Sequence, residues 1–142
     1  MKVVYIIVIV ALLIVAITVT VSLQPKNETD MAYHITLADP KLYKNGIFVD
    51  SFKIQNGTYQ FRFVPNGDSP QELSISLKGN NFSYNEDFVL QGTIHNTGIS
   101  NYYTWDYQGH KATEIPKDQE IQILINPHGS VLGSVSVDLM KI

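Results

Sequence analysis

The chain has 142 residues, no cysteine, and a formal net charge of −3 from 10 basic and 13 acidic side chains. The lack of cysteine excludes disulfides, thiolate metal sites and thiol catalysis. The acidic balance argues against a nucleic-acid partner, because binding to phosphates favours clustered Lys and Arg.

An apolar segment opens the chain and runs from Val3 to Leu23 without a charge, a Pro or a Gly. A helix of this length spans about 30 Å, the thickness of the hydrocarbon core of a bilayer. We therefore expect residues 1–23 to anchor the protein in the lipid bilayer as a single pass, with the N-terminus cytoplasmic. Thr18, Thr20 and Ser22 form an imperfect cleavage site, so a cleaved signal and a secreted product are the alternative.

Residues 24–31 have no periodicity and contain Pro25, which predicts a short exposed linker before a domain over residues 32–142. Three N-x-S/T triplets begin at Asn27, Asn56 and Asn81. In a host that glycosylates, they favour an extracytoplasmic location for this domain. The other interpretation is that Asn-rich loops produce such triplets by chance.

The domain shows alternating apolar and polar residues in short runs separated by turn residues, and no helical periodicity. This predicts an all-β fold, an antiparallel Ig-like β-sandwich of about 7–9 strands, preceded by the transmembrane helix. Asn56-Gly57 predicts a two-residue hairpin turn that pairs Ile54 with Tyr59 and Phe52 with Phe61. Residues 80–87, NNFSYNED, predict a polar loop.

Two segments align at an offset of 62 residues. Phe61-x-Phe63-x-Pro65-x-Gly67 with the strand that follows matches Ile123-x-Ile125-x-Pro127-x-Gly129 with its own following strand. Reuse of a common β-hairpin pattern is one explanation. The other is two copies of a small β unit packed around a pseudo-twofold axis.

Short motifs resemble known β-sandwich families. Phe88-Val-Leu-Gln-Gly-Thr-Ile-His-Asn-Thr-Gly98 and Ile115-Pro-Lys-Asp-Gln-Glu-Ile-Gln-Ile123 resemble strands and turns of exported Ig-like domains of the CARDB type. This resemblance implies a spacer or binding module. Asn56-Gly-Thr-Tyr-Gln-Phe-Arg-Phe63 is similar to a strand of GOLD domains.

The last loop, Asn126-Pro-His-Gly-Ser-Val-Leu-Gly-Ser-Val-Ser-Val137, resembles the final loop and strand of cupredoxins. A blue copper site requires a Cys thiolate just before the His and usually has a Met soon after it, and here Ile125 and Val131 occupy those positions. A type 1 copper site is therefore excluded, and we expect no cofactor.

Candidate metal and catalytic groups are scattered along the chain. No two of the histidines at positions 34, 95, 110 and 128 lie within five residues of each other, which favours surface histidines over a metal cluster. Glu86 and Asp87 lie near several Asn residues, but the spacing of a calcium loop is absent. No nucleophile elbow is present, so we expect no enzyme activity.

The most promising binding surface is the aromatic run Tyr102-Tyr103-Thr-Trp105-Asp-Tyr107. In a strand, Tyr103, Trp105 and Tyr107 share one face and Tyr102 lies on the other. We expect the first three to pack in the core. The alternative is an exposed platform for a glycan or a partner protein.

These observations predict a membrane-anchored extracytoplasmic β-sandwich that acts as a binding or spacer module at the cell surface. One alternative is a subunit of a pilin- or archaellin-like filament, which also joins an apolar N-terminal helix to a β-sandwich. Another is a secreted carbohydrate-binding protein or small enzyme released by cleavage near Ser22.

Overall fold

The computed structural model describes residues 30–142. The predicted anchor over residues 1–23, nearly all of the linker and the triplet at Asn27 lie outside the described residues. Among residues 30–142, none of the helical segments has the length and apolar character needed to cross a membrane.

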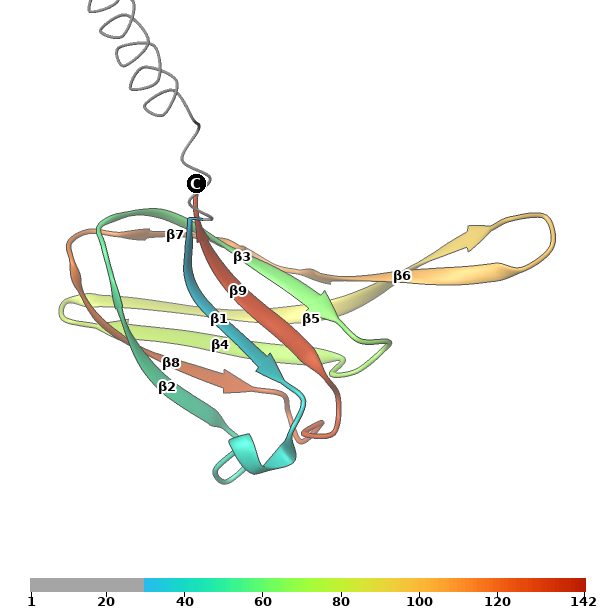
Figure 1. Ribbon diagram of the computed structural model, residues 1–142, viewed down its shortest axis with the longest axis horizontal. Coiled ribbons are helices and arrows are strands. Elements are labelled where there is room, and N and C mark those ends of the chain that lie inside the picture. Colours follow the sequence, from blue (N-terminus) through green and yellow to red (C-terminus); the bar gives the residue numbers. More distant parts are fainter. Residues whose placement is uncertain (1–29) are drawn as a thin grey trace, which may run out of the picture.

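Nine antiparallel strands form two sheets of four and five strands, which pack as the two layers of a β-sandwich (Figure 1). This confirms the predicted antiparallel sandwich. A 3-10 helix, η1, occupies Pro40–Leu42. The strands are β1 Met31–Leu37, β2 Phe48–Ile54, β3 Gly57–Pro65, β4 Glu72–Gly79, β5 Phe82–Asn96, β6 Asn101–Gln108, β7 Ala112–Ile115, β8 Gln119–Asn126 and β9 Val135–Lys141.

The strand pairs are nested. β1 pairs with β9, β2 with β8, β3 with β7 and β4 with β5, so the chain resembles one long hairpin rolled into two layers. The resulting sheet orders are β1-β9-β3-β7 and β2-β8-β4-β5-β6. Nested pairing of eight strands in two sheets is the jelly-roll arrangement, with β6 added at one edge. In immunoglobulin domains the first two strands share a sheet, whereas here they lie in opposite sheets.

The Asn56-Gly57 turn connects the two sheets. β2 belongs to the five-stranded sheet and β3 to the four-stranded sheet. The predicted hairpin between these strands is therefore wrong. Both strands have the expected alternation, but Ile54 and Phe52 pair with β8, whereas Tyr59 and Phe61 pair with β9.

The internal repeat coincides with the pairing register. Phe61 pairs with Leu139 and Phe63 with Val137 in one sheet. Shifting each of these positions by 62 residues gives the pairs Ile123–Leu77 and Ile125–Ile75, both of which occur in the other sheet. The two aligned units are thus equivalent in pairing, as the pseudo-twofold interpretation requires.

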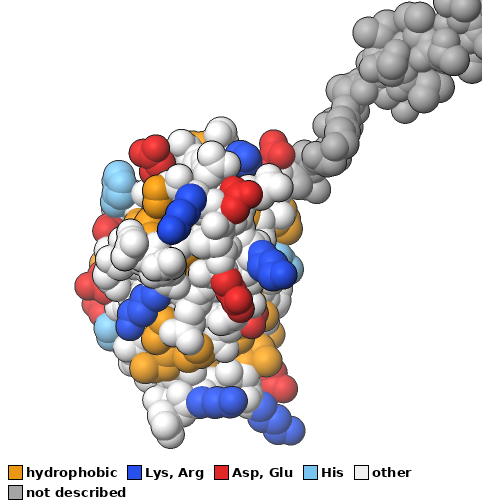
Figure 2. Space-filling view, turned by 90° about the vertical axis from the view of Figure 1, so that its left-hand side faces the viewer, with side chains coloured by type: hydrophobic (Ala, Val, Ile, Leu, Met, Phe, Trp, Pro, Cys, Tyr) orange, Lys and Arg blue, Asp and Glu red, His pale blue; other side chains and the backbone are white. Residues whose placement is uncertain are grey.

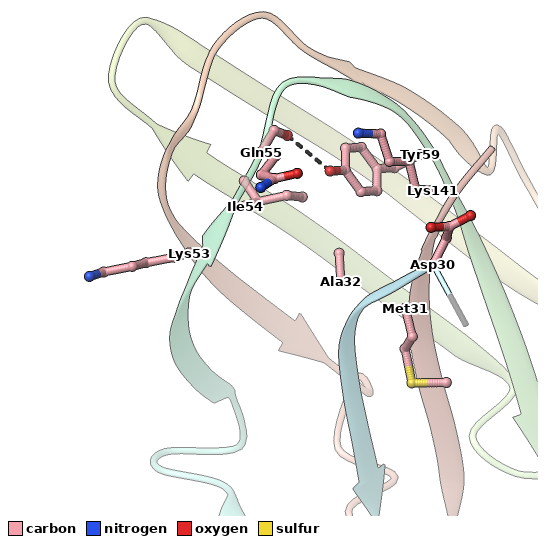
Figure 3. A pocket seen from close by; sticks show the side chains of 8 residues that line it. All are labelled: Asp30, Met31, Ala32, Lys53, Ile54, Gln55, Tyr59 and Lys141. Atoms are coloured by element: carbon pink, nitrogen blue, oxygen red, sulfur yellow. Dashed lines mark hydrogen bonds between the residues drawn. The ribbon is translucent and has the colours of Figure 1, made fainter. Parts of the chain in front are cut away.

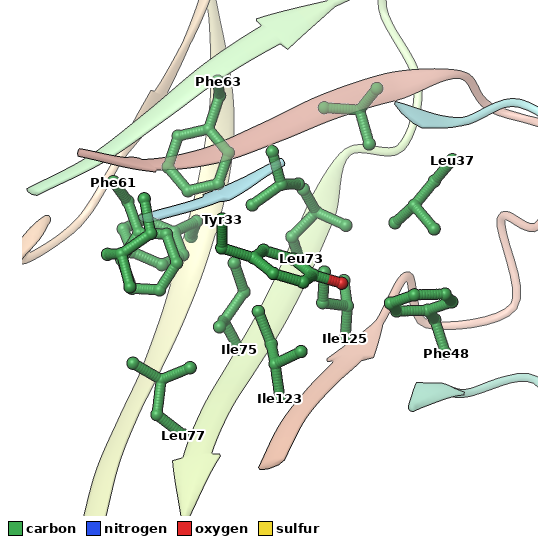
Figure 4. Packing of buried hydrophobic residues seen from close by; sticks show 14 of the residues in the cluster. Tyr33, Leu37, Phe48, Phe61, Phe63, Leu73, Ile75, Leu77, Ile123 and Ile125 are labelled. Atoms are coloured by element: carbon green, nitrogen blue, oxygen red, sulfur yellow. The ribbon is translucent and has the colours of Figure 1, made fainter. Parts of the chain in front are cut away.

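The core lies between the sheets and consists of the inward side chains of every strand except the outer part of β5 and β6 (Figure 4). Leu73, Ile75 and Leu77 of β4 lie opposite Phe61 and Phe63 of β3. Burial of each such side chain stabilises the fold by about 1.5–3 kcal/mol. The polar loop expected over residues 80–87 is wrong: Asn80 and Asn81 form a two-residue turn, and β5 begins at Phe82.

The ends of the described chain lie together. The Lys141 amide donates a hydrogen bond of 2.6 Å to the Asp30 carbonyl, and the Ile142 amide donates one of 3.0 Å to the Thr58 carbonyl. Any segment before residue 30 therefore joins the sandwich at the edge that also holds the C-terminus (Figure 1).

Candidate functional site

The candidate site is a two-stranded arm formed by the outer half of β5 and most of β6. β4 pairs with β5 only as far as Val89, and from there to Asn96 the partner of β5 is β6. This hairpin projects well beyond both sheets (Figure 1). We define the arm as residues 92–105.

One face of the arm continues the inner face of the five-stranded sheet. The register pairs Leu90 with Tyr107, then Gly92 with Trp105, then Ile94 with Tyr103. Leu90 and Tyr107 are buried in the core, whereas Ile94 and Tyr103 are 55% and 56% exposed. The apolar row that begins inside the sandwich thus emerges onto the arm without a covering sheet. We call Ile94, Tyr103 and Trp105 the arm stripe.

Trp105 lies flat against the backbone of Gly92. A Cβ atom placed on Gly92 would be 2.6 Å from the indole ring, so only glycine leaves room for the ring in this position. The Tyr103 ring stacks next to the indole, with centroids 5.7 Å apart and planes inclined by 20°. The stripe is therefore an ordered aromatic surface.

The opposite face of the arm is more polar. Here the His95 and Tyr102 rings stack with centroids 4.8 Å apart, and His95 Nε2 lies 2.8 Å from the Thr104 hydroxyl. At the tip, Ile99 is 98% exposed. Two turn contacts, Thr97 amide to Ser100 carbonyl and Gly98 amide to Asn96 Oδ1, order the tip.

The root of the arm is fixed in the core by Tyr107. Its hydroxyl donates a 2.5 Å hydrogen bond to the Pro70 carbonyl, and its ring packs against Phe63 at 5.1 Å. Burial, with a smaller contribution from Tyr43, raises the pKa of Tyr107 well above its ordinary value. Beside it, Lys111 forms an ion pair of 3.0 Å with Asp106. On this face, the buried row of Leu90 and Tyr107 is therefore followed directly by the row of Gly92 and Trp105, where the arm begins.

The arm carries no Lys, Arg, Asp or Glu. The end of the molecule opposite the arm shows side chains of both signs spread over the surface (Figure 2). An uncharged projection on an acidic domain favours neutral partners, since charged ones gain no ion pair there.

The expected core position is correct for Tyr107, holds in part for Trp105 and is wrong for Tyr103. Trp105 is half-buried against the rim of the core, and Tyr103 is exposed because the four-stranded sheet ends before it reaches this row. Tyr102 is exposed on the opposite face, as expected. The sequence motifs did not predict Ile94, Ile99 or Gly92 as parts of this surface. A usable signal was present: the stretch from Phe88 to Trp105 has no charged residue.

The four histidines lie in different parts of the sandwich. His34 and Arg62 flank Asp138 on the outer face of the four-stranded sheet. His34 Nδ1 donates a hydrogen bond of 2.5 Å to Asp138 Oδ1, and Arg62 donates two hydrogen bonds, of 2.7 and 2.9 Å, to Asp138 Oδ2. Burial works to raise the pKa of Asp138, but these two donors hold it below its ordinary value. Thr36 Oγ1 is 3.4 Å from His34 Nε2, beyond the range for efficient proton transfer.

The other polar groups serve local contacts. The Ser74 hydroxyl donates to Asp87 over 2.5 Å and accepts from His128 Nε2 over 2.7 Å. Glu86, adjacent to Asp87 on β5, accepts from the His110 amide. These carboxylates engage different partners, and no group of three or more potential metal ligands occurs within residues 30–142.

A hollow of about 330 Å³ lies where the chain enters the sandwich (Figure 3). It is bordered by Asp30, Lys141 and Tyr59, whose hydroxyl donates to the Gln55 carbonyl over 3.0 Å. Lys53 points away from it (Figure 3). The mixture of one carboxylate and one amine gives this hollow no preference for an anion or a cation.

Two of the three predicted glycosylation triplets are described, and both are in turns. Asn56 is exposed between β2 and β3, and its amide donates to Asp118 Oδ1 over 2.8 Å. Asn81 is exposed in the β4–β5 turn with φ of 60°. Their use remains a prediction.

Comparison with known proteins gives no family. No protein-family model matches the chain, and no curated protein or solved structure matches it significantly. The candidate function therefore depends on the geometry of the arm.

Proposed function

We propose that this protein is a membrane-anchored, outward-facing binding module that contacts its partner through the arm. The observation that carries the proposal is the uncovered arm stripe, which projects from an otherwise well-packed sandwich. Exposed contiguous apolar surface on a soluble domain commonly marks an interaction site.

The composition of the arm supports binding over a purely structural role. It combines Tyr and Trp with Asn, Ser, Thr and Gly. Binding surfaces use these residue types because rigid aromatic rings supply contact area at low entropic cost, while small polar residues supply adaptable hydrogen bonds. A spacer needs no such surface, and an uncovered hairpin would only lower its solubility.

The proposed membrane orientation is tested by thiol labelling. Because the chain has no cysteine, only the introduced thiol of each variant can react. Ser100→Cys places a thiol on the exposed arm tip, and Lys2→Cys places one before the apolar segment. In intact cells, a membrane-impermeant maleimide should label the first variant and not the second. Carbonate washing should leave the chain in the membrane fraction. Labelling of Lys2→Cys alone, or release by carbonate, would contradict the proposed anchor.

Binding is tested with the purified full chain in nanodiscs and washed envelopes of the organism that makes it. Tyr103→Glu should reduce envelope binding on the order of tenfold, the loss expected from an aromatic anchor worth about 1.4 kcal/mol. Val64→Glu is the matched control, since Val64 is 55% exposed on the outer face of β3, opposite to the face that packs on the root of the arm. Equal binding by the two variants would exclude the arm as the binding element.

A further inference from the structure

We infer that the arm stripe binds the arm stripe of a second copy of this chain. The inference rests on the proposed function and deepens it by naming the partner. Two arms would pack face to face around a twofold axis, with Ile94, Tyr103 and Trp105 of each copy between them. The contact extends outward the two-layer packing that the sandwich uses internally.

The nature of the surface supports this occupant. The inner face of a sheet in a sandwich is normally covered by the inner face of another sheet. The arm stripe is such an inner face, because its rows follow directly from Leu90 and Tyr107 in the core. The four-stranded sheet contacts β6 through β3, where Phe63 packs against Tyr107 at the root of the arm. The same stripe on another copy is an inner face of this kind.

Charge supports the same occupant. After Lys2, the chain carries 9 basic and 13 acidic side chains, since 10 minus Lys2 leaves 9, so two copies repel each other with a charge of −4 each. Residues 92–105 contain no Lys, Arg, Asp or Glu side chain. A contact between two arms therefore brings no like charges together and keeps the acidic sandwiches away from each other. A twofold contact also requires a self-complementary patch. A neutral apolar stripe meets that requirement, whereas a patch of one charge does not.

The stability of the arm points the same way. A hairpin of two strands is marginally stable in water without a third strand or a packed face. Within residues 30–142 the arm has no third strand, and beyond Trp105, which packs against the rim of the core, it has no packed face. A second arm would supply the missing face to both copies at once.

The size of the contact predicts how strong it is. The stripe has three large side chains per copy, well short of the surface of about 800 Å² per partner that stable complexes bury. Free chains should therefore associate weakly. Anchoring two copies in one bilayer raises their effective concentration and favours the contact. Association should thus be strong in membranes and lost on dilution in detergent.

Cross-linking in native membranes tests the contact. Ile94→Cys places the only thiol of the chain near the twofold axis, and a short bis-maleimide should link two copies into a dimer. Val64→Cys, with the same exposed fraction of 55%, should give at least about tenfold less dimer. A bifunctional reagent is needed because facing sheets are about 10 Å apart, too far for a direct disulfide. Equal dimer yields from the two positions would overturn the inference.

A charge exchange separates self-contact from other partners. In the Ile94→Cys background, Tyr103→Glu in both copies should abolish the cross-link by like-charge repulsion, and Tyr103→Lys should do the same. Co-expression of the two variants should restore it, because opposite charges then face each other. Trp105 emission of each variant checks that the arm remains folded, since Trp105 is the sole tryptophan. A loss in all three combinations would show that another partner, such as a glycan or a different protein, occupies the stripe.

The outcomes also separate the two proposals. If Ser100→Cys is labelled from outside and the charge exchange fails to restore the cross-link, the anchored binding module stands and the second copy is excluded. If a neutral oligosaccharide shifts Trp105 emission and suppresses the cross-link, the stripe is a sugar site and the inference is wrong.

Discussion

Trp105 lies flat on Gly92 in the first uncovered row of the arm, and a Cβ atom on Gly92 would be 2.6 Å from its ring. Gly92→Ala should therefore push the indole away from the backbone and shift its emission to longer wavelength. Because the ring is already half-buried at most, the free energy of unfolding should change by less than about 1 kcal/mol. Thr93→Ala, on the opposite face, is the control and should leave the emission unchanged. An unshifted spectrum for Gly92→Ala would contradict the flat packing.

The boundary between core and arm lies along β5 and is testable by truncation. Phe88 is fully buried and Ile94 is 55% exposed, although both point to the same side of the strand. Phe88→Ala should lower the free energy of unfolding by about 3–5 kcal/mol, since it leaves a cavity. Ile94→Ala should cost less than about 1 kcal/mol. Chemical denaturation of both variants measures the difference, and similar losses would mean that the arm is covered in the isolated chain.

Tyr107 attaches the arm to the core through its hydrogen bond to the Pro70 carbonyl. Tyr107→Phe keeps the ring but leaves a buried carbonyl without its donor, which should cost about 1–3 kcal/mol. The thermal midpoint should fall by several degrees, as expected for a domain of this size. Tyr102→Phe removes an exposed hydroxyl and should leave the midpoint within about one degree. A midpoint for Tyr107→Phe equal to that of Tyr102→Phe would show that this bond does not stabilise the fold.

Asp138 should make the stability of the fold depend on pH in the acidic range. Its pKa is lowered in the folded state, where burial opposes ionisation but His34 and Arg62 favour it more strongly. A lowered pKa contributes stability above the unfolded value near 3.9, and this stability is lost as the pH falls through the lower folded value. Denaturation midpoints should therefore decline below about pH 4. Asp138→Asn should weaken that decline, whereas Glu114→Gln, at an exposed position on β7, should leave it unchanged. An unaltered decline in Asp138→Asn would contradict this assignment.

Buried tyrosines should make the fold sensitive to alkali. Burial is the largest cause that raises the pKa of Tyr33, Tyr84 and Tyr107, and the nearby Asp50 and Glu86 add to it for the first two. A raised folded pKa gives stability that is present below about pH 10 and is lost as the pH rises above it. Tyrosinate absorbance of the folded protein above pH 10 should be lower than that of the urea-unfolded chain at the same pH. Identical titration curves would show that these phenols are not shielded.

Local sequence patterns predicted the element types well. Period-2 alternation identified the inward side chains of β3, β4, β8 and β9, because successive side chains of a strand point to opposite faces of the sheet. The pattern was weaker for the start of β5, where Asn85 and Asp87 on the outer face, and Glu86 in the inward row between Tyr84 and Phe88, hid the strand. The offset of 62 residues likewise anticipated the equivalent pairing of two units, since equal sequences favour equal register.

The sequence by itself determined that the domain is a two-layer β fold and, for most strands, which face is apolar. Tertiary structure alone decided which sheet each strand joins: Phe52 and Phe61 flank a favourable turn sequence, yet pair with β8 and β9. It also decided that Tyr107 is buried while Tyr103, two rows along the same face, is exposed. The physical reason is that alternation specifies only the side to which a residue points. Whether anything covers that side depends on where a distant strand ends.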